Sequence, residues 1–166
     1  MRLFIAIDVS KEVQDYLLKI QSKLDRSVRL TKSFHITLKY LGEVSENLVP
    51  KIKEKLDEIK FEDFELELLE LGTFPNKNFI KVIWIGVKDQ LQIMKLQEQV
   101  EKKLKEFNFK RDFNFHPHIT LARVNRKIKF PNINIEKIEF KVSNFYLYQS
   151  TLTPQGPIYT KIKEFT

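Results

Sequence analysis

Apolar side chains recur along the chain in two spacings, one typical of strands and one typical of amphipathic helices. Alternating or continuous apolar runs predict strands over residues 2–8, 28–32, 35–41, 64–68, 79–87, 117–124, 136–148 and 158–165. Apolar residues three and four positions apart predict helices over residues 13–24, 48–59 and 91–107, with Ser10, Ser45 or Asn47, and Asp89 near their starts. The chain therefore contains a mixture of helices and strands, and several strands follow one another directly.

Turn-forming sequences separate several of these strands. Residues 75–78 and 153–157 are rich in Pro, Asn and Gly and favour tight connections. Many neighbouring strands are therefore expected to pair as hairpins, which favours an α+β fold with antiparallel sheets. No linker rich in Pro, Ser or Gly divides the chain, so residues 1–166 are expected to form a single catalytic domain.

Composition narrows the class of protein. Apolar residues make up 42% of the 166 positions, which is enough for a hydrophobic core and excludes a disordered chain. Without Cys there is no disulfide, no thiolate nucleophile and no Cys-ligated zinc. A net charge of +7 favours anionic partners. No apolar run approaches the roughly 18 residues of a membrane span, so a cytoplasmic protein without a membrane partner is expected, most simply a monomer.

A four-residue repeat is anchored on two of the three His residues. His35-Ile36-Thr37-Leu38 recurs 83 positions later as His118-Ile119-Thr120-Leu121, half a chain away and again on a predicted strand. Because successive strand side chains point to opposite faces, each His shares a face with its Thr while Ile and Leu face the core. The repeat predicts two related lobes whose His and Thr residues meet at a cleft.

Two imidazoles and two hydroxyls suit chemistry at a phosphate diester. Imidazoles titrate near neutral pH, so one can act as general base and the other as general acid. The hydroxyls of Thr37 and Thr120 can donate to phosphate oxygens, where charge gathers in the transition state. Such a set requires neither metal nor cofactor.

The sequence resembles the 2H phosphoesterase superfamily, and within it the RNA 2′,3′-cyclic phosphodiesterases, also called 2′-5′ RNA ligases. The similarity rests on the repeat in its flanks Phe34-His35-Ile36-Thr37-Leu38-Lys39-Tyr40-Leu41-Gly42 and His116-Pro117-His118-Ile119-Thr120-Leu121-Ala122-Arg123, on residues 2–8, and on residues 152–159. These segments span nearly the whole chain.

The resemblance implies a bilobal, duplicated α+β fold, in which two antiparallel sheets flanked by helices surround a central cleft with one motif strand in each lobe. It implies hydrolysis of a ribose 2′,3′-cyclic phosphate to a 2′-phosphate and reversible 2′-5′ joining of RNA ends, with tRNA fragments among the candidate substrates. His118 would be the proton acceptor and His35 the proton donor. Thr37 and Thr120 would hold the phosphate, and Arg123 would bind phosphate or the RNA backbone.

Neighbouring residues extend the candidate site. Lys39 has the parity of His35 and Thr37 and is expected at the edge of the cleft as a substrate-binding residue. Arg123 has the opposite parity to His118, so in a regular strand its side chain would point away from the cleft. A bulge between the two residues would direct it back into the cleft. His116 precedes a proline and is expected to be structural rather than catalytic. Tyr146, Tyr148 and Phe74 are alternative candidates for stacking a base.

Three readings compete with this hypothesis. The three His residues could form a zinc site, although Thr neighbours and the lack of a nearby carboxylate argue against it. The cleft could hold RNA ends without turnover. The same chemistry could also act on 2′-5′-linked oligoadenylate or on a cyclic phosphate of an ADP-ribose derivative.

Overall fold

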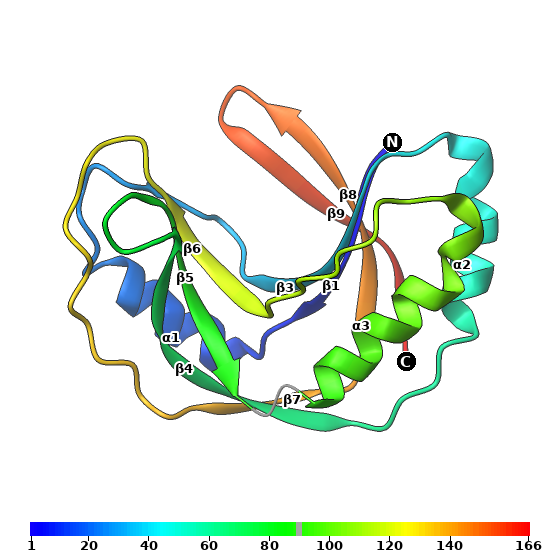
Figure 1. The fold of residues 1–166 in the computed structure, drawn as a ribbon, viewed down its shortest axis with the longest axis horizontal. Helices are drawn as coiled ribbons and strands as arrows, with labels where there is room; N and C mark the ends of the chain where they lie inside the picture. Colours follow the sequence, from blue (N-terminus) through cyan, green and yellow to red (C-terminus); the bar gives the residue numbers. More distant parts are fainter. Residues whose placement is uncertain (89–90) are drawn as a thin grey trace.

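Two antiparallel sheets form the body of the protein (Figure 1). The computed structural model describes residues 1–88 and 91–166. One sheet has the order β3-β1-β8-β9 and the other the order β2-β6-β5-β4-β7. Their bounds are β1 Arg2–Asp8, β2 Arg29–Leu30, β3 His35–Glu43, β4 Phe64–Pro75, β5 Ile80–Lys88, β6 His118–Arg123, β7 Glu139–Val142, β8 Phe145–Thr153 and β9 Gly156–Phe165. The predicted α+β class with two antiparallel sheets is confirmed.

In the described part of the chain, three α-helices cover the outer faces of the sheets: α1 Lys11–Gln21, α2 Val49–Asp57 and α3 Leu91–Lys103. The Ser10 hydroxyl accepts a hydrogen bond from the Val13 amide at 3.3 Å and so caps α1, as the sequence predicts. Short 3-10 turns precede α2 (Glu46–Leu48) and follow α3 (Lys105–Phe107). The suggested start of the third helix at Asp89 lies outside the described residues.

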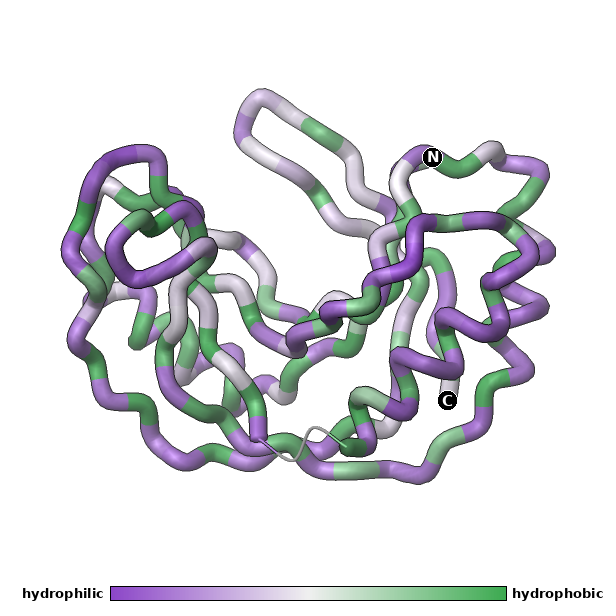
Figure 2. The backbone as a smooth tube through the Cα atoms, in the orientation of Figure 1, coloured by the Kyte–Doolittle hydropathy of each residue, from purple (hydrophilic) through white to green (hydrophobic). Residues whose placement is uncertain are grey.

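Helices α1 and α3 each pack against the sheet that does not contain the strand before them. Helix α1 follows β1 in sequence but packs against β6 of the other sheet, while α3 follows β5 and packs against β3. Apolar faces of α1 and α3 meet the buried Ile and Leu residues of both sheets in one continuous core. Figure 2 shows hydrophobic and hydrophilic positions alternating along these helices. Each motif strand is therefore backed by a helix from the other half of the chain.

One predicted strand is wrong as a single element. Residues 136–148 contain two strands, β7 and β8, which belong to different sheets. Phe140 and Val142 are buried at even positions, whereas Phe145 and Leu147 are buried at odd positions. The change of phase marks the place where the chain crosses between sheets. The strand expected at residues 28–32 is reduced to the two residues of β2.

Within the described ranges, no helix is long and apolar enough to cross a lipid bilayer.

Candidate active site

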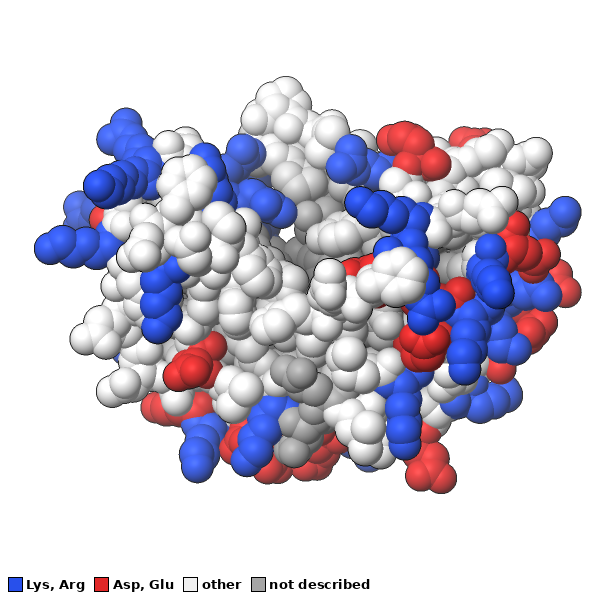
Figure 3. Space-filling model, viewed as in Figure 1, with Lys and Arg blue, Asp and Glu red and all other residues white. Residues whose placement is uncertain are grey.

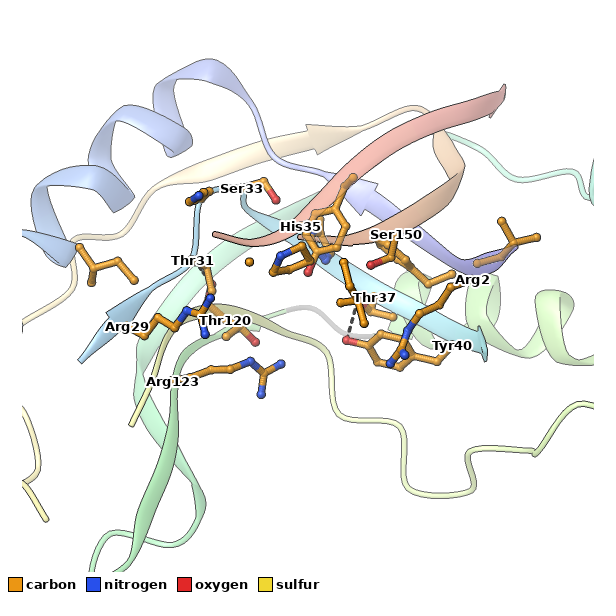
Figure 4. Close-up of a pocket in the computed structure, with 18 of the residues that line it drawn as sticks. Arg2, Arg29, Thr31, Ser33, His35, Thr37, Tyr40, Thr120, Arg123 and Ser150 are labelled. Carbon is orange, nitrogen blue, oxygen red and sulfur yellow. Dashed lines mark hydrogen bonds between the residues drawn. The ribbon is translucent and has the colours of Figure 1, made fainter. Parts of the chain in front are cut away.

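A cavity of about 470 Å³ lies between the two motif strands, β3 and β6. His35, Thr37, His118 and Thr120 all line it. The Ile and Leu residues of the two motifs point away from it and are no more than 1% exposed. Figure 4 shows His35, Thr37 and Tyr40 along one side of the cavity and Thr120, Arg123 and Arg29 along the other. The structure thus brings the His and Thr residues of both motifs into one site, although the motifs lie 83 positions apart in the sequence.

Both motif strands carry a bulge at the same place. Against β1, Thr37 pairs with Ala6 and Lys39 with Ile5, so Leu38 is an additional residue. Against β5, Thr120 pairs with Trp84 and Ala122 with Ile83, so Leu121 is additional. A bulge reverses which side chains face the cleft beyond it. The residues that rejoin the cavity are therefore the next ones along, Tyr40 and Arg123.

Lys39 does not line the cavity, which corrects the expectation from strand parity. The bulge turns its side chain to the opposite face, where it is 4% exposed. Its ammonium donates to both carboxylate oxygens of Glu101 at 2.9 Å and to the carbonyl of Lys110 at 2.7 Å. Gln97 donates to the same carboxylate at 3.1 Å. Lys39 thus joins β3 to α3 and does not bind substrate in this arrangement.

Replacing Lys39 by Met is expected to lower the free energy of unfolding by about 3–5 kcal/mol, because Glu101 would remain buried without its counter-charge. Chemical denaturation at neutral pH measures the loss. The double variant Lys39→Met/Glu101→Gln removes both charges and keeps an acceptor for Gln97, so it should recover most of the stability. A single variant within about 1 kcal/mol of the parent would contradict this role for the pair.

Two arginines, Arg29 and Arg123, lie across the cavity from Tyr40, whereas Arg2 lies beside Tyr40. Arg123 and Arg29 are paired in the register of β2 and β6, and both line the cavity. The turn between β8 and β9 lies beside them, since Lys32 donates to the carbonyl of Gln155 at 2.9 Å. Gly156 has a φ of +109°, and a Cβ there would lie 3.0 Å from the Arg29 guanidinium. The hairpin therefore closes this end of the cavity and needs glycine at its turn.

His118 is held in one tautomer by its own strand. Its Nδ1 lies 2.6 Å from the carbonyl oxygen of His116, which can only accept a hydrogen bond. Nδ1 therefore carries the proton, and the lone pair of the neutral ring lies on Nε2. Burial is the main cause of a lowered His118 pKa, partly offset by this hydrogen bond. The neutral ring is thus a proton acceptor.

The exposed His116 ring packs outside the cavity, with its centroid 4.8 Å from that of Trp84. Phe74 lies on the same side and contacts His118 edge-on at 5.0 Å between centroids. His116 therefore contributes a backbone carbonyl and aromatic packing to the placement of His118. No signal in the sequence pointed to the carbonyl, because it depends on the backbone between His116 and His118.

His35 lies within an aromatic cluster on the other side. Phe4 and Tyr159 approach it with ring centroids at 5.2 and 5.4 Å. Behind them, Asp8 accepts a hydrogen bond from the Tyr148 hydroxyl and pairs with Lys161 at 2.6 Å. Tyr148, Tyr146 and Phe74, the predicted base-stacking candidates, do not line the cavity, whereas Tyr40 and Tyr159 do.

Burial dominates the electrostatics of His35. It lowers the pKa of the ring from 6.5 to about 4, the nearby Asp8 carboxylate raises the pKa, and His118 lowers it further. His35 is therefore neutral at neutral pH. An anion bound beside it would act as Asp8 does and raise its pKa.

This pKa has a consequence for stability. The unfolded chain binds a proton at His35 below about pH 6.5 and the folded chain only below about pH 4, so the free energy of unfolding falls as pH falls through that window. The full effect would be about 3 kcal/mol, reduced where the ring edge meets water in the cavity.

Denaturation midpoints of the parent and of His35→Gln at pH 7 and pH 4 measure the contribution of His35 to the pH dependence of stability. Between pH 7 and pH 4 the parent should lose more stability than His35→Gln. A substitution of the exposed residue, His116→Gln, serves as the control and should lose as much stability as the parent. Equal losses in the parent and in His35→Gln would show that burial does not penalise the charged ring.

The three His residues do not form a metal-binding group. His116 and His118 have ring centroids 6.1 Å apart, and only His118 of the two lines the cavity with His35. Among the residues for which side chains are described, no cluster of three or more His, Asp or Glu is arranged to hold a metal ion. The zinc hypothesis therefore has no geometric support from this set.

Comparison with known proteins places these features in one family. The model of the 2′-5′ RNA ligase superfamily matches residues 8–153. Proteins named RNA 2′,3′-cyclic phosphodiesterase from Archaeoglobus fulgidus and Methanocaldococcus jannaschii are each 37% identical, covering 99% of this chain and 99% and 100% of their own lengths. The crystal structure of TT0787 of Thermus thermophilus superposes with a TM-score of 0.89 at 28% identity, covering 99% of this chain and 97% of that one.

Proposed function

The chain belongs to the 2′-5′ RNA ligase superfamily, and we propose that it is a cyclic phosphodiesterase that opens terminal 2′,3′-cyclic phosphates of RNA to 2′-phosphates by two-His catalysis. The observation that carries the proposal is the pair of His-x-Thr strands lining one cavity. Relatives that match over nearly their whole length carry the same activity in their names. The basic charge of +7 suits an anionic substrate.

The first proton transfer is assigned to His118. Its Nε2 lone pair takes a proton from water while the water oxygen attacks phosphorus, so that a P–O bond forms. General base catalysis requires the unprotonated ring, and in that ring the hydrogen bond from Nδ1 to the His116 carbonyl leaves the lone pair on Nε2. The lowered pKa of His118 keeps the ring unprotonated at neutral pH.

The second proton transfer is assigned to His35. As the bond between phosphorus and the ribose 3′-oxygen breaks, His35 gives its proton to that oxygen, and the product is a 2′-phosphomonoester. The ring needs a proton for this role, and its pKa of about 4 keeps it neutral before a phosphate binds. The negative charge of the bound phosphate raises this pKa and so favours protonation of His35 when substrate binds.

Charge on the phosphate is stabilised by the remaining polar groups of the cavity. The hydroxyls of Thr37 and Thr120 donate to non-bridging oxygens, and the Arg123 guanidinium supplies a positive charge beside them. A 5′-hydroxyl in the place of water would follow the same path and form a 2′-5′ phosphodiester. Hydrolysis and ligation then share both His residues.

Product analysis tests the proposed reaction. The parent protein, treated with chelator, is incubated with a short RNA ending in a 2′,3′-cyclic phosphate, and the product is separated against 2′- and 3′-phosphate standards. A 2′-phosphate is expected. A 3′-phosphate would show that the ribose 2′-oxygen leaves in place of the 3′-oxygen. Unchanged RNA would favour an RNA-binding role without turnover.

A further inference from the structure

Acidic residues are absent from three segments that meet at one end of the molecule. No Asp or Glu occurs in residues 26–42, 71–88 or 113–135, although the chain contains 22 acidic residues. These segments supply β2, the end of β4, β5, β6 and adjoining loops of one sheet, and also most of β3 of the other sheet. In Figure 3 the lobe at the upper left, where these loops lie, carries blue side chains and almost no red ones. The positive charge of the protein is therefore concentrated on one lobe.

A groove opens on this lobe beside the end of β6. Its walls include Phe79 just before β5, Lys81 within β5, and Arg126 and Lys127 from the segment after β6. We call it the basic groove and define it by these four residues. Within residues 1–88 and 91–166, Lys81, Arg126 and Lys127 form no ion pair with a carboxylate, whereas Lys88 further along β5 pairs with Glu67 at 3.8 Å. The unpaired cations of the groove are free to meet an external anion.

An exposed aromatic ring completes the chemistry of the groove. Phe79 is 58% exposed, and the ammonium of Lys81 lies 4.9 Å from its ring centroid. Cations combined with an accessible aromatic face are characteristic of surfaces that bind single-stranded nucleic acid, where bases stack and phosphates pair. An acidic peptide would use the cations but would have no need of the ring.

The basic groove begins one residue beyond the candidate active site along the chain. Arg123 lines the cavity and the next residue, Val124, lines the groove. The backbone amide of Val124 donates to the carbonyl of Lys81 at 2.8 Å, which fixes the two walls together. Three residues of extended chain cover about 10 Å, so Arg126 lies within about three stacked nucleotides of Arg123.

We propose that the basic groove binds the single-stranded RNA backbone that leads to the terminal cyclic phosphate, with Phe79 stacking on a base. The proposal rests on the proposed function and specifies its substrate class as an oligonucleotide rather than a cyclic mononucleotide. Lys81, Arg126 and Lys127 hold the phosphates two or three positions before the reacting end. The groove adds affinity for the polymer and takes no part in the chemical step.

Two substrates separate binding in the groove from chemistry in the cavity. One is an RNA of about eight nucleotides ending in a 2′,3′-cyclic phosphate, and the other is the matching cyclic mononucleotide. The variant Lys81→Ala/Arg126→Ala/Lys127→Ala should lower kcat/KM for the oligonucleotide about 10- to 100-fold, mainly through KM. Turnover of the mononucleotide should stay within about twofold of the parent. Phe79→Ala should cost the oligonucleotide about tenfold.

A matched control removes the same charge elsewhere. Lys51, Lys102 and Lys105 are exposed and line neither the cavity nor the groove. Their triple Ala variant should behave like the parent on both substrates. Equal losses in the two triple variants would overturn the proposal, because overall charge would then explain them. Equal losses on the two substrates would also overturn it.

Binding supplies an independent measurement. The dissociation constant of the same RNA, measured by fluorescence anisotropy over a series of salt concentrations, should show a slope of log Kd against log salt that is smaller by about 2 in the groove variant. An unchanged slope would overturn the groove as an RNA site. A parent that binds this RNA with the expected slope but turns over neither substrate would contradict the proposed function while supporting the groove.

Discussion

Replacing His118 by Ala is expected to lower kcat for the cyclic phosphate of RNA by about 10²- to 10⁴-fold, the usual contribution of a general base. The side chain removed is the one whose Nε2 lone pair faces the cavity, because its Nδ1 is committed to the His116 carbonyl at 2.6 Å. Without it, water must attack phosphorus without losing its proton. Single-turnover rates with saturating enzyme measure the effect on the chemical step.

The neighbouring histidine provides the control. His116→Ala removes a ring of the same type two residues away but keeps the backbone carbonyl that orients His118. Its activity should stay within about fivefold of the parent. If His118→Ala kept more than a tenth of the parent rate, or if His116→Ala lost as much, the assignment of the base to His118 would be wrong.

Replacing His35 by Ala is expected to cause a loss of the same order, but with a different dependence on the leaving group. His35 protonates the departing 3′-oxygen, and a sulfur at that position leaves as a thiolate without needing a proton. On a cyclic phosphate with a bridging 3′-sulfur, His35→Ala should approach the parent rate within about tenfold. His118→Ala should remain defective on both substrates, because the attacking water still needs its base.

The two substrates therefore distinguish an acid from a base. If sulfur rescued His118→Ala in place of His35→Ala, the two roles would be exchanged. If sulfur rescued neither variant, proton donation by His35 would be contradicted and a binding role would explain its loss.

Proton donation by His35 also affects the pH dependence of kcat and kcat/KM. Because substrate raises the His35 pKa from about 4, the fall in activity at high pH should occur at a higher pH for kcat than for kcat/KM. The two profiles would coincide if the bound phosphate did not change the protonation of His35.

Local sequence rules located the motif strands but failed at their fifth position. Alternation in His35-Ile36-Thr37-Leu38 separates cavity from core because the backbone there is regular. The bulge at Leu38 then reverses the alternation, so Lys39 is buried with Glu101 and Tyr40 returns to the cavity. The same bulge at Leu121 returns Arg123. A comparison of the sixth residue of each motif strand, counted from its His, would have paired Tyr40 with Arg123.

Other parts of the site depend on contacts between distant segments. Arg29 reaches the cavity because β2 pairs with β6, and Gly156 meets Arg29 because the β8–β9 hairpin crosses to the other lobe. Neither contact follows from periodicity, since each is set by how the two sheets pack. The split of residues 136–148 was readable in principle, from the change of phase between Val142 and Phe145.

In the proposed reaction, His35 and His118 act on one phosphate from opposite sides. A crystal structure of the protein with a 2′-phosphate nucleotide, the product of the proposed reaction, tests it most directly. We expect Nε2 of His118 and a ring nitrogen of His35 each within about 2.6–3.2 Å of different oxygens at the phosphate, with the hydroxyls of Thr37 and Thr120 bound to the others. A phosphate held by only one of the two His residues, or held outside the cavity between β3 and β6, would contradict the account.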